Sequence, residues 1–181
     1  DCDGTLADTM PAHYVAWHTT MQRHGITFTE DRFYALGGVP SEKIVAMRAG
    51  EAGLTLDAVA VAHEKELAYV EFLHEIKPVD RVITIARDHR GKLPMAVATG
   101  SARWLAEKSL TQIGVLDWFD ALACSDDVTN HKPAPDVFPE AARRIHIEPR
   151  DCCAYEDTDL GIAAAKAAGM DVVDVRTFEV H

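Results

Sequence analysis

The spacing of apolar residues along the chain changes near residue 77. Before that point, apolar side chains recur three and four residues apart, as Tyr14, Trp17 and Met21 do. This spacing places them on one face of a helix. The glycine pair at residues 37–38 interrupts the pattern as a turn does. We therefore expect residues 11–77 to be wholly helical.

After residue 77, short continuous apolar runs alternate with stretches of helical periodicity. Such runs are typical of strands that are buried on both faces of a parallel sheet, and their alternation with helices predicts an α/β fold. The runs expected to form strands are residues 95–98, 121–124, 152–155 and 172–175. The predicted fold is a Rossmann-like parallel sheet with helices on both faces, formed by residues 1–10 and 78–181. Residues 11–77 are inserted into it as a helical segment.

Polar residues stand directly after several of these runs. Thr99-Gly100-Ser101 follows the run at 95–98, and Glu156-Asp157 follows the run at 152–155. In an open α/β sheet, ligands bind beyond the carboxyl ends of the strands, so these residues are candidates for one site. Asp1-Cys2-Asp3-Gly4-Thr5 is a polar segment of the same kind as those that follow the apolar runs. By the same reasoning, we expect an apolar strand to lie immediately before Asp1.

The composition narrows the classes of function. The chain has 181 residues, with 18 Lys and Arg against 29 Asp and Glu and a net charge of −11. This charge is unfavourable for binding a nucleic-acid backbone. No apolar run reaches the length of about eighteen residues that suggests a membrane span. The four cysteines lack CxxC spacing, which we interpret as reduced thiols of a cytoplasmic protein. The pattern does not indicate an oligomeric state.

The acidic residues at the start of the chain suggest a metal site. Asp1 and Asp3 lie two residues apart, so on an extended backbone their side chains share a face. Crowded carboxylates repel one another unless a cation lies among them, and oxygen ligands suit Mg²⁺. With a phosphate also bound, Thr99 would donate to one of its oxygens and Lys132 would neutralise another. Together these groups provide what phosphoryl transfer requires.

Taken in order, these motifs resemble those of the haloacid dehalogenase-like phosphohydrolases. The resemblance is carried by Asp1-Cys2-Asp3-Gly4-Thr5, Thr99-Gly100-Ser101, Lys132 in Lys-Pro-Ala-Pro-Asp, and Glu156-Asp157-Thr158-Asp159-Leu160-Gly161. Each motif alone is weak evidence, but four of them in order, over nearly the whole chain, are a strong signal. The resemblance implies that residues 11–77 form a helical cap that selects the substrate.

The resemblance also implies catalytic roles for the matched residues. Asp1 would attack phosphorus and become an aspartyl-phosphate. Asp3 would protonate the leaving oxygen and then take a proton from the hydrolytic water. Thr99 and Lys132 would hold the transferring phosphoryl group. Gly100 and Ser101, in the same loop as Thr99, would contribute to substrate binding.

The metal site implied by the resemblance uses four acidic residues. Mg²⁺ would be bound by the Asp1 carboxylate, the Asp3 main-chain carbonyl and Asp157, with Glu156 nearby or acting through water. The expected partner is a small phosphorylated metabolite, with no nucleic acid and no membrane.

Within this family, the insert most resembles the cap of the sugar-phosphate branch, which contains β-phosphoglucomutases and fructose-1-phosphate-type phosphatases. Its candidate substrate-binding residues are His13, Trp17, Gly38 and Lys65. The mutases carry an arginine after the Gly-Val turn to grip a second phosphate. Here residues 40–42, Pro-Ser-Glu, occupy that region. The sequence therefore favours a phosphatase acting on a sugar phosphate or a similar metabolite, with a β-phosphoglucomutase-type isomerase as the alternative.

Other interpretations stay open at several positions. His13 and Trp17 lie one helical turn apart and would also suit packing between helices. Lys65 would equally suit a solvated charged face with Glu64 and Glu66. A non-enzymatic alternative is a phosphoacceptor receiver domain, which also combines acids, Mg²⁺, a hydroxyl and a lysine on a parallel sheet. Its phosphoacceptor would lie on a later strand, and it would have no place for the long helical insert.

Overall fold

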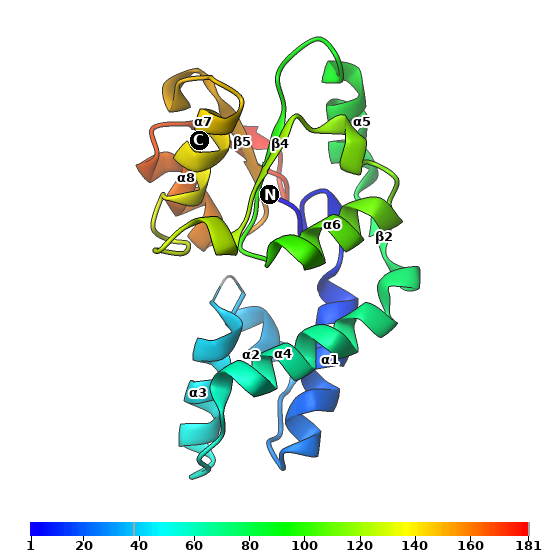
Figure 1. Cartoon of the computed structure of the whole chain (residues 1–181), viewed down its shortest axis with the longest axis vertical. Coiled ribbons are helices and arrows are strands. Elements are labelled where there is room, and N and C mark those ends of the chain that lie inside the picture. Colours follow the sequence, from blue (N-terminus) through cyan, green and yellow to red (C-terminus); the bar gives the residue numbers. More distant parts are fainter. Residues whose placement is uncertain (38, 181) are drawn as a thin grey trace. The chain divides into compact units, whose positions relative to one another are not determined.

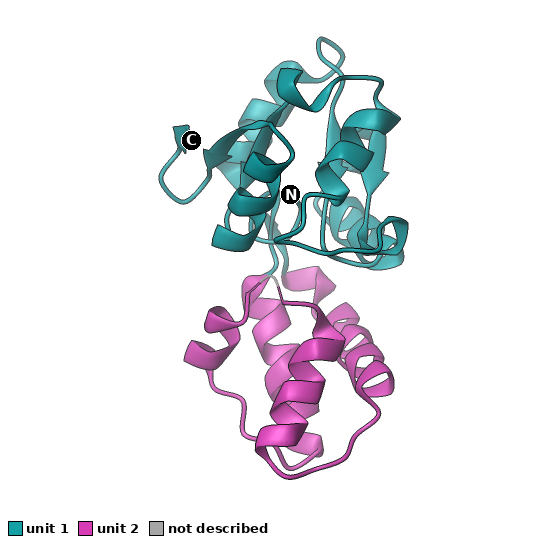
Figure 2. Cartoon of the chain, turned by 90° about the vertical axis from the view of Figure 1, so that its left-hand side faces the viewer, with its two compact units in different colours: residues 1–9, 76–181 teal, residues 10–75 magenta. Residues whose placement is uncertain are grey.

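The computed structural model describes residues 1–37 and 39–180, which form two compact units. Figure 2 shows the first unit, Asp1–Thr9 with Ile76–His181, and the second, Met10–Glu75. These bounds differ by one and two residues from the boundaries at 11 and 77 expected from the sequence. Gly38, an expected substrate-binding residue, lies outside the described residues.

Two short strands mark where the chain leaves the first unit and returns to it. They are β1 (Ala7–Asp8) and β2 (Lys77–Pro78), which pair antiparallel. Asp8 lies opposite Lys77 in this pairing. The expectation of helix up to residue 77 is therefore wrong at its end, because Lys77 pairs as a strand and no longer contributes to a helical face.

The second unit is helical, as its apolar spacing predicted. Its elements are α1 (Met10–Arg23), α2 (Glu30–Ala35), α3 (Ser41–Glu51), α4 (Ala58–Glu71) and a 3₁₀ turn, η1 (Leu73–Glu75) (Figure 1). Trp17 and Met21 of α1 are buried in one apolar cluster with Val45 of α3 and Val61 of α4. Asp57 caps α4, since its side chain accepts hydrogen bonds from the main-chain N–H groups of residues 59 and 60.

In the first unit, the four apolar runs form strands. β3 (Ala96–Ala98) pairs with β4 (Ala121–Ala123), and β5 (Cys153–Glu156) pairs with β6 (Asp171–Asp174), both in parallel. β7 (Glu179–Val180) adds an antiparallel partner to β6. The predicted α/β fold is confirmed, and the strand ends differ from the apolar runs by one residue.

Helices pack on both faces of these strands. They are α5 (Asp80–His89), α6 (Arg103–Gln112), α7 (Val137–Arg144) and α8 (Asp159–Ala167). Residues of α7 and α8 form an apolar cluster with Ala98, whereas residues of α5 and α6 cluster with Val97. Adjacent strand residues point to opposite faces, so β3 has a core on each side. Of the helices described, none is long and apolar enough to cross a membrane.

A cavity of about 470 Å³ lies within this unit and is lined by residues of β3, β5, α5 and α7. Asp1 is among its lining residues, and its main-chain nitrogen donates a hydrogen bond to the carbonyl of Tyr155 on β5 at 2.9 Å. This bond places Asp1 near the carboxyl end of β5. The strand expected before Asp1 stays a prediction.

The last turn of α7 carries two arginines that share one acid. Arg143 donates two hydrogen bonds of 2.8 Å to the Glu140 carboxylate, and Arg144 Nε donates a third, of 2.6 Å, to Glu140 Oε1. The hydrogen bonds from Arg143 and Arg144 lower the pKa of Glu140 to about 2.

We expect Glu140→Gln to destabilise the protein in a pH-dependent way. A carboxyl group whose pKa is lower in the folded state stabilises the fold above its ordinary pKa of 4.5 and loses this effect as the pH falls toward about 2. Urea unfolding of both proteins should therefore give a difference in free energy of unfolding that is largest near neutral pH and shrinks toward about pH 2. A difference that does not change with pH would contradict this role.

Candidate functional site

Lys132 joins two of the expected site residues. Its Nζ donates to Asp1 Oδ1 at 2.9 Å and makes a second, shorter contact with Glu156 Oε1. The three side chains are at most 8% exposed. The ammonium group is therefore held between two carboxylates away from water, where a charge is tolerated only beside opposite charge. Lys132 lies between β4 and α7, and the peptide bond that follows it is cis.

Glu156, the last residue of β5, is completely buried. Its Oε2 accepts hydrogen bonds from the N–H groups of Asp157 and Thr158 at 3.1 and 3.2 Å, and from the Thr158 hydroxyl at 3.2 Å. Burial raises the pKa of Glu156, but the charge of Lys132, the positive main-chain nitrogen of Asp1 and the hydrogen bonds to the carboxylate together hold the pKa below its ordinary value. Glu156, expected near the metal, thus also holds Lys132.

The start of α8 packs directly on this carboxylate. A Cβ added to Gly161 would lie 2.0 Å from Glu156 Cδ, so any side chain at residue 161 would displace Glu156. The Thr158 hydroxyl accepts a hydrogen bond from the Gly161 N–H at 3.0 Å and caps the helix. In the sequence, Gly161 stood out only as the end of a motif. The close approach of the helix start to Glu156 explains why this position is glycine.

Asp157 lies beside the loop that follows Asp3. Its Oδ1 accepts a hydrogen bond from the Thr5 hydroxyl at 3.1 Å. Burial, and then the charge of Glu156, raise the pKa of Asp157 to about 6. Gly4 has a φ of +77°, and a Cβ at that position would lie 2.2 Å from Asp157 Oδ2. Both the backbone conformation and the close approach therefore require glycine.

Three carboxylates form a cluster that suits a cation. One oxygen from each of Asp1, Glu156 and Asp157 lies within 4.8 Å of the others. Carboxylate oxygens are ligands for hard divalent cations, and burial together with the neighbouring Glu156 charge raises the pKa of Asp157. The residues present therefore fit a divalent metal ion. Asp3 was expected to contribute its main-chain carbonyl, and its carboxylate has a different partner.

The Thr99-Gly100-Ser101 loop follows β3 and meets Asp3. Ser101 Oγ donates to Asp3 Oδ2 at 2.5 Å, and the Ser101 N–H donates to Thr99 Oγ1 at 3.1 Å. Thr99 is buried, and its N–H donates to the Ala123 carbonyl at 2.9 Å, which continues the β3–β4 pairing. Gly100 is exposed, with open space where a side chain would stand. The pairing of β3 with β4 thus fixes this loop beside Asp3.

The helical unit brings together three of its expected substrate-binding residues. Lys65 Nζ lies 3.0 Å from His13 Nδ1, in a hydrogen bond, and 5.2 Å from the centroid of the Trp17 ring. His13 stacks on Tyr69 with ring centroids 3.9 Å apart. Lys65 is only 4% exposed, so its interpretation as part of a solvated charged face is wrong. Trp17 also packs in one apolar cluster with Val45 of α3 and Val61 of α4, which is the packing between helices considered as its alternative.

Two residues with close contacts were missed by the sequence analysis. Thr158 was quoted in a motif but given no role, although a threonine just before a helix is a signal for an N-cap. Tyr69 was given no role. It lies four residues after Lys65, and on a helix this spacing puts the two side chains side by side.

Comparisons with known proteins agree with the motifs. The family model "Haloacid dehalogenase-like hydrolase" matches residues 1–175. The chain is 39% identical to fructose-1-phosphate phosphatase YqaB of Escherichia coli (strain K12), over 97% of this chain and 94% of that protein. It is 30% identical to a phosphorylated carbohydrates phosphatase of Thermotoga maritima, over 94% of this chain and 80% of that protein.

Among solved structures, the β-phosphoglucomutase of Clostridium difficile has a TM-score of 0.86 at 26% identity, over 96% of this chain and 81% of that chain. The match of the family model over residues 1–175 covers all four motifs noted in the sequence. The chain therefore belongs to the haloacid dehalogenase-like hydrolase family.

Proposed function

We propose that this hydrolase is a phosphatase that releases inorganic phosphate from a small phosphorylated metabolite, namely a sugar phosphate. The observation that carries the proposal is the buried Lys132 ammonium between the carboxylates of Asp1 and Glu156. A fixed cation beside an acidic nucleophile suits the transfer of an anionic phosphoryl group. The relatives named as phosphatases of fructose 1-phosphate and of phosphorylated carbohydrates support the substrate class.

The proposed reaction has two steps. An Asp1 oxygen attacks phosphorus, the bond to the sugar oxygen breaks, and Asp3 gives its proton to that leaving oxygen. Water then attacks the aspartyl-phosphate, Asp3 takes the proton from this water, and the bond to Asp1 breaks to release inorganic phosphate. Lys132 and Thr99 hold the phosphoryl oxygens, while the hydrogen bond from Ser101 orients Asp3. The exposed Gly100 leaves room for the phosphoryl group beside this loop.

The metal proposed for this site is Mg²⁺. Asp1 and Asp157 would hold it with the Asp3 main-chain carbonyl, and Glu156 would act from nearby or through water. When bound, the ion supplies positive charge that offsets the phosphoryl oxygens and the crowded carboxylates. The chain's own part is to hold these acids close together, which the hydrogen bonds to Glu156 and Asp157 accomplish.

The phosphatase is favoured over the phosphomutase alternative by two observations. The chain is 39% identical to the fructose-1-phosphate phosphatase but 28% identical to the β-phosphoglucomutase of Bacillus subtilis. The region after the Gly-Val turn also lacks an arginine for a second phosphate, with Pro40 and Glu42 there instead.

For the helical unit, we propose a role in recognising the substrate. His13 and Lys65 form a buried polar pair on two different helices, with Trp17 and Tyr69 against it. A buried lysine that meets a histidine and aromatic rings provides a cation for an anionic ligand. Gly38 belongs to the same proposal from the sequence resemblance alone.

The function is tested by following phosphate release from a panel of hexose and pentose monophosphates with Mg²⁺. We expect release from at least one of these esters and loss of activity when the metal is chelated. Interconversion of glucose 1-phosphate and glucose 6-phosphate that requires a bisphosphate primer would instead support the mutase.

Asp1→Asn should lower kcat by about three orders of magnitude or more, whereas Asp151→Asn, at an exposed aspartate, should leave kcat unchanged.

Gly161→Ala should impair both stability and turnover. The added methyl group would collide with Glu156, and this displaces the carboxylate that holds Lys132. The matched control is Gly50→Ala in α3, where a Cβ meets nothing within 4 Å. Helix propensity predicts that this control is stabilised by up to about 1 kcal/mol with unchanged kcat. Thermal unfolding and steady-state kinetics of both variants check the prediction, and equal behaviour of the two would refute it.

Lys65→Met tests recognition by the helical unit. Methionine keeps the apolar stem but removes the charge, so we expect KM for the preferred sugar phosphate to rise about tenfold or more with kcat less affected. Lys43→Met is the control, because Lys43 is exposed on α3 and its loss changes the net charge equally. Unchanged KM in a folded Lys65→Met protein would remove Lys65 from substrate recognition.

A further inference from the structure

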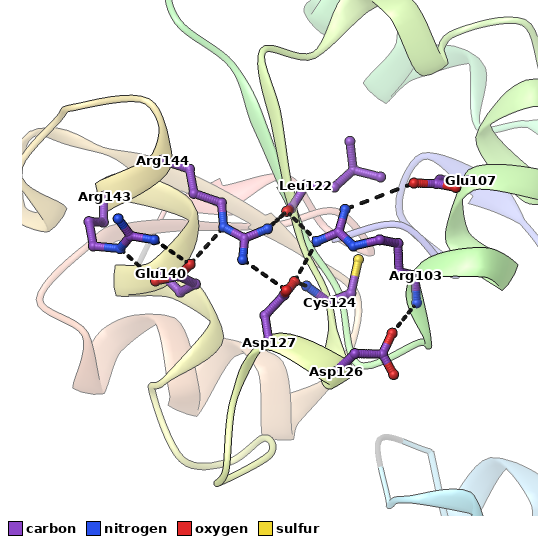
Figure 3. A network of polar contacts seen from close by, with 9 residues as sticks. All are labelled: Arg103, Glu107, Leu122, Cys124, Asp126, Asp127, Glu140, Arg143 and Arg144. Atoms are coloured by element: carbon purple, nitrogen blue, oxygen red, sulfur yellow. Dashed lines mark hydrogen bonds and ion pairs between the residues drawn. The ribbon is translucent and has the colours of Figure 1, made fainter.

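A network of charged side chains joins β4, α6 and α7 away from the carboxylate cluster. At its centre is Asp127, in the turn that follows β4. Figure 3 shows the guanidinium groups of Arg103 and Arg144 approaching this carboxylate from opposite sides. Arg103 Nη2 lies 2.6 Å from Asp127 Oδ2, and Arg144 Nη2 lies 2.8 Å from Asp127 Oδ1. We call Arg103, Asp127 and Arg144 the arginine clamp.

The clamp is also tied to the main chain of β4. Asp127 Oδ2 accepts a hydrogen bond from the Cys124 N–H at 2.8 Å, and the Leu122 carbonyl accepts hydrogen bonds from both arginines. Burial alone would raise the pKa of Asp127, but the hydrogen bonds from Arg144 and from the Cys124 N–H, together with the charges of both arginines, lower it. Asp127 is therefore a charged acceptor at the end of this strand.

One arm of the clamp reaches the loop that carries Thr99 and Ser101. Arg103 is the first residue of α6 and lies two residues after Ser101, and its N–H donates to Asp126 Oδ2 at 2.6 Å. The same turn after β4 also holds the loop itself, because the Ser125 N–H donates to the Ser101 carbonyl at 3.1 Å. The position of this loop thus depends on the turn at residues 125–127.

The other arm reaches the helix that follows Lys132. Arg144 is the last residue of α7, and this helix begins five residues after Lys132. Lys132 Nζ also lies 5.0 Å from the ring centroid of Phe138, in the first turn of α7. A shift of α7 would therefore move a side chain that contacts the lysine.

The clamp can couple the positions of α6 and α7 because its side chains are partly shielded from water. The Asp127 side chain is 16% exposed, and those of Arg103 and Arg144 are 35% and 25% exposed. Charge-assisted hydrogen bonds are stronger than neutral ones, and partial shielding from water strengthens them further. Loss of the Asp127 charge would leave two guanidinium groups close together without the acid between them.

We propose that Asp127 is a positioning residue that sets the spacing between the two groups that hold the phosphoryl moiety, the Thr99–Ser101 loop and Lys132. The proposal rests on the phosphatase function proposed above. It assigns no contact with substrate to Asp127. Its effect passes through Arg103 to the start of α6 and through Arg144 to the end of α7.

The variant that tests this is Asp127→Asn. The amide has one acceptor oxygen, so it cannot accept from the Cys124 N–H and Arg103 on one side and from Arg144 on the other. The control is Glu140→Gln, which also removes a carboxylate that binds Arg144. Its amide oxygen still accepts from Arg144 Nε and leaves both contacts of Asp127 in place. Both variants lose stability, but only the first breaks the clamp.

The measurements are kcat and KM for the ester that the unaltered protein hydrolyses best, and the inhibition constant of orthovanadate, a phosphate mimic. All are taken well below the melting temperature of each variant. We expect Asp127→Asn to lower kcat and to weaken inhibition by vanadate, each by about tenfold, while Glu140→Gln stays within about twofold of the unaltered protein. If Asp127→Asn does not fold, Arg144→Gln, which removes one arm, should change both quantities in the same direction.

Kinetic constants and vanadate inhibition that are unchanged in folded Asp127→Asn would overturn the proposal and leave the clamp a purely stabilising network. An equal loss in Glu140→Gln would overturn it too, because general destabilisation would then explain the effect. If the unaltered protein hydrolyses no phosphate ester, the proposed function fails and this inference fails with it. Activity in the unaltered protein with no effect of Asp127→Asn refutes the inference alone.

Discussion

The contact on which the site depends is the buried ammonium group of Lys132 between Asp1 and Glu156. Burying one carboxylate costs several kcal/mol, and burying two near each other costs more, unless opposite charge and hydrogen-bond donors surround them. Lys132 supplies that charge, and the N–H groups at the start of α8 supply the donors. The close approach of Gly161 follows from this arrangement, because the helix start must reach the buried acid.

The site contains more carboxylates than Lys132 can neutralise, and this excess of negative charge explains why a metal cation fits there. Lys132 supplies one positive charge to Asp1 and Glu156, and the carboxylate of Asp157 lies close to both of these acids. The pKa of Asp157 is raised to about 6, first by burial and then by the charge of Glu156. The fold therefore holds together groups that would separate in solution, and a divalent ion is the ligand that relieves their repulsion.

How far the site could be predicted from the sequence differs between its parts. The strand-end argument grouped Asp1, Asp3, Thr99 and the Glu156-Asp157 pair as candidates for one site, because the carboxyl ends of parallel strands meet at one edge. Lys132 was added from the chemistry of phosphate binding and from the motif resemblance. The sequence could not assign Glu156 to Lys132, since two acids in sequence look alike and only burial distinguishes them. For Lys65 it left the wrong alternative open, because Glu64 and Glu66 beside it resemble a solvated face, while the helix turns Lys65 inward.

The sequence by itself determined the α/β class, the helical insert, the order of the four motifs and the membership of the family. These follow from periodicity and from short motifs, which are local properties of the chain. Only the tertiary structure decided which polar groups meet, such as Ser101 with Asp3 and Thr5 with Asp157. It also decided that Arg103 and Arg144 share Asp127. Such contacts join residues far apart in the chain, and they depend on how helices and strands pack, which no local pattern records.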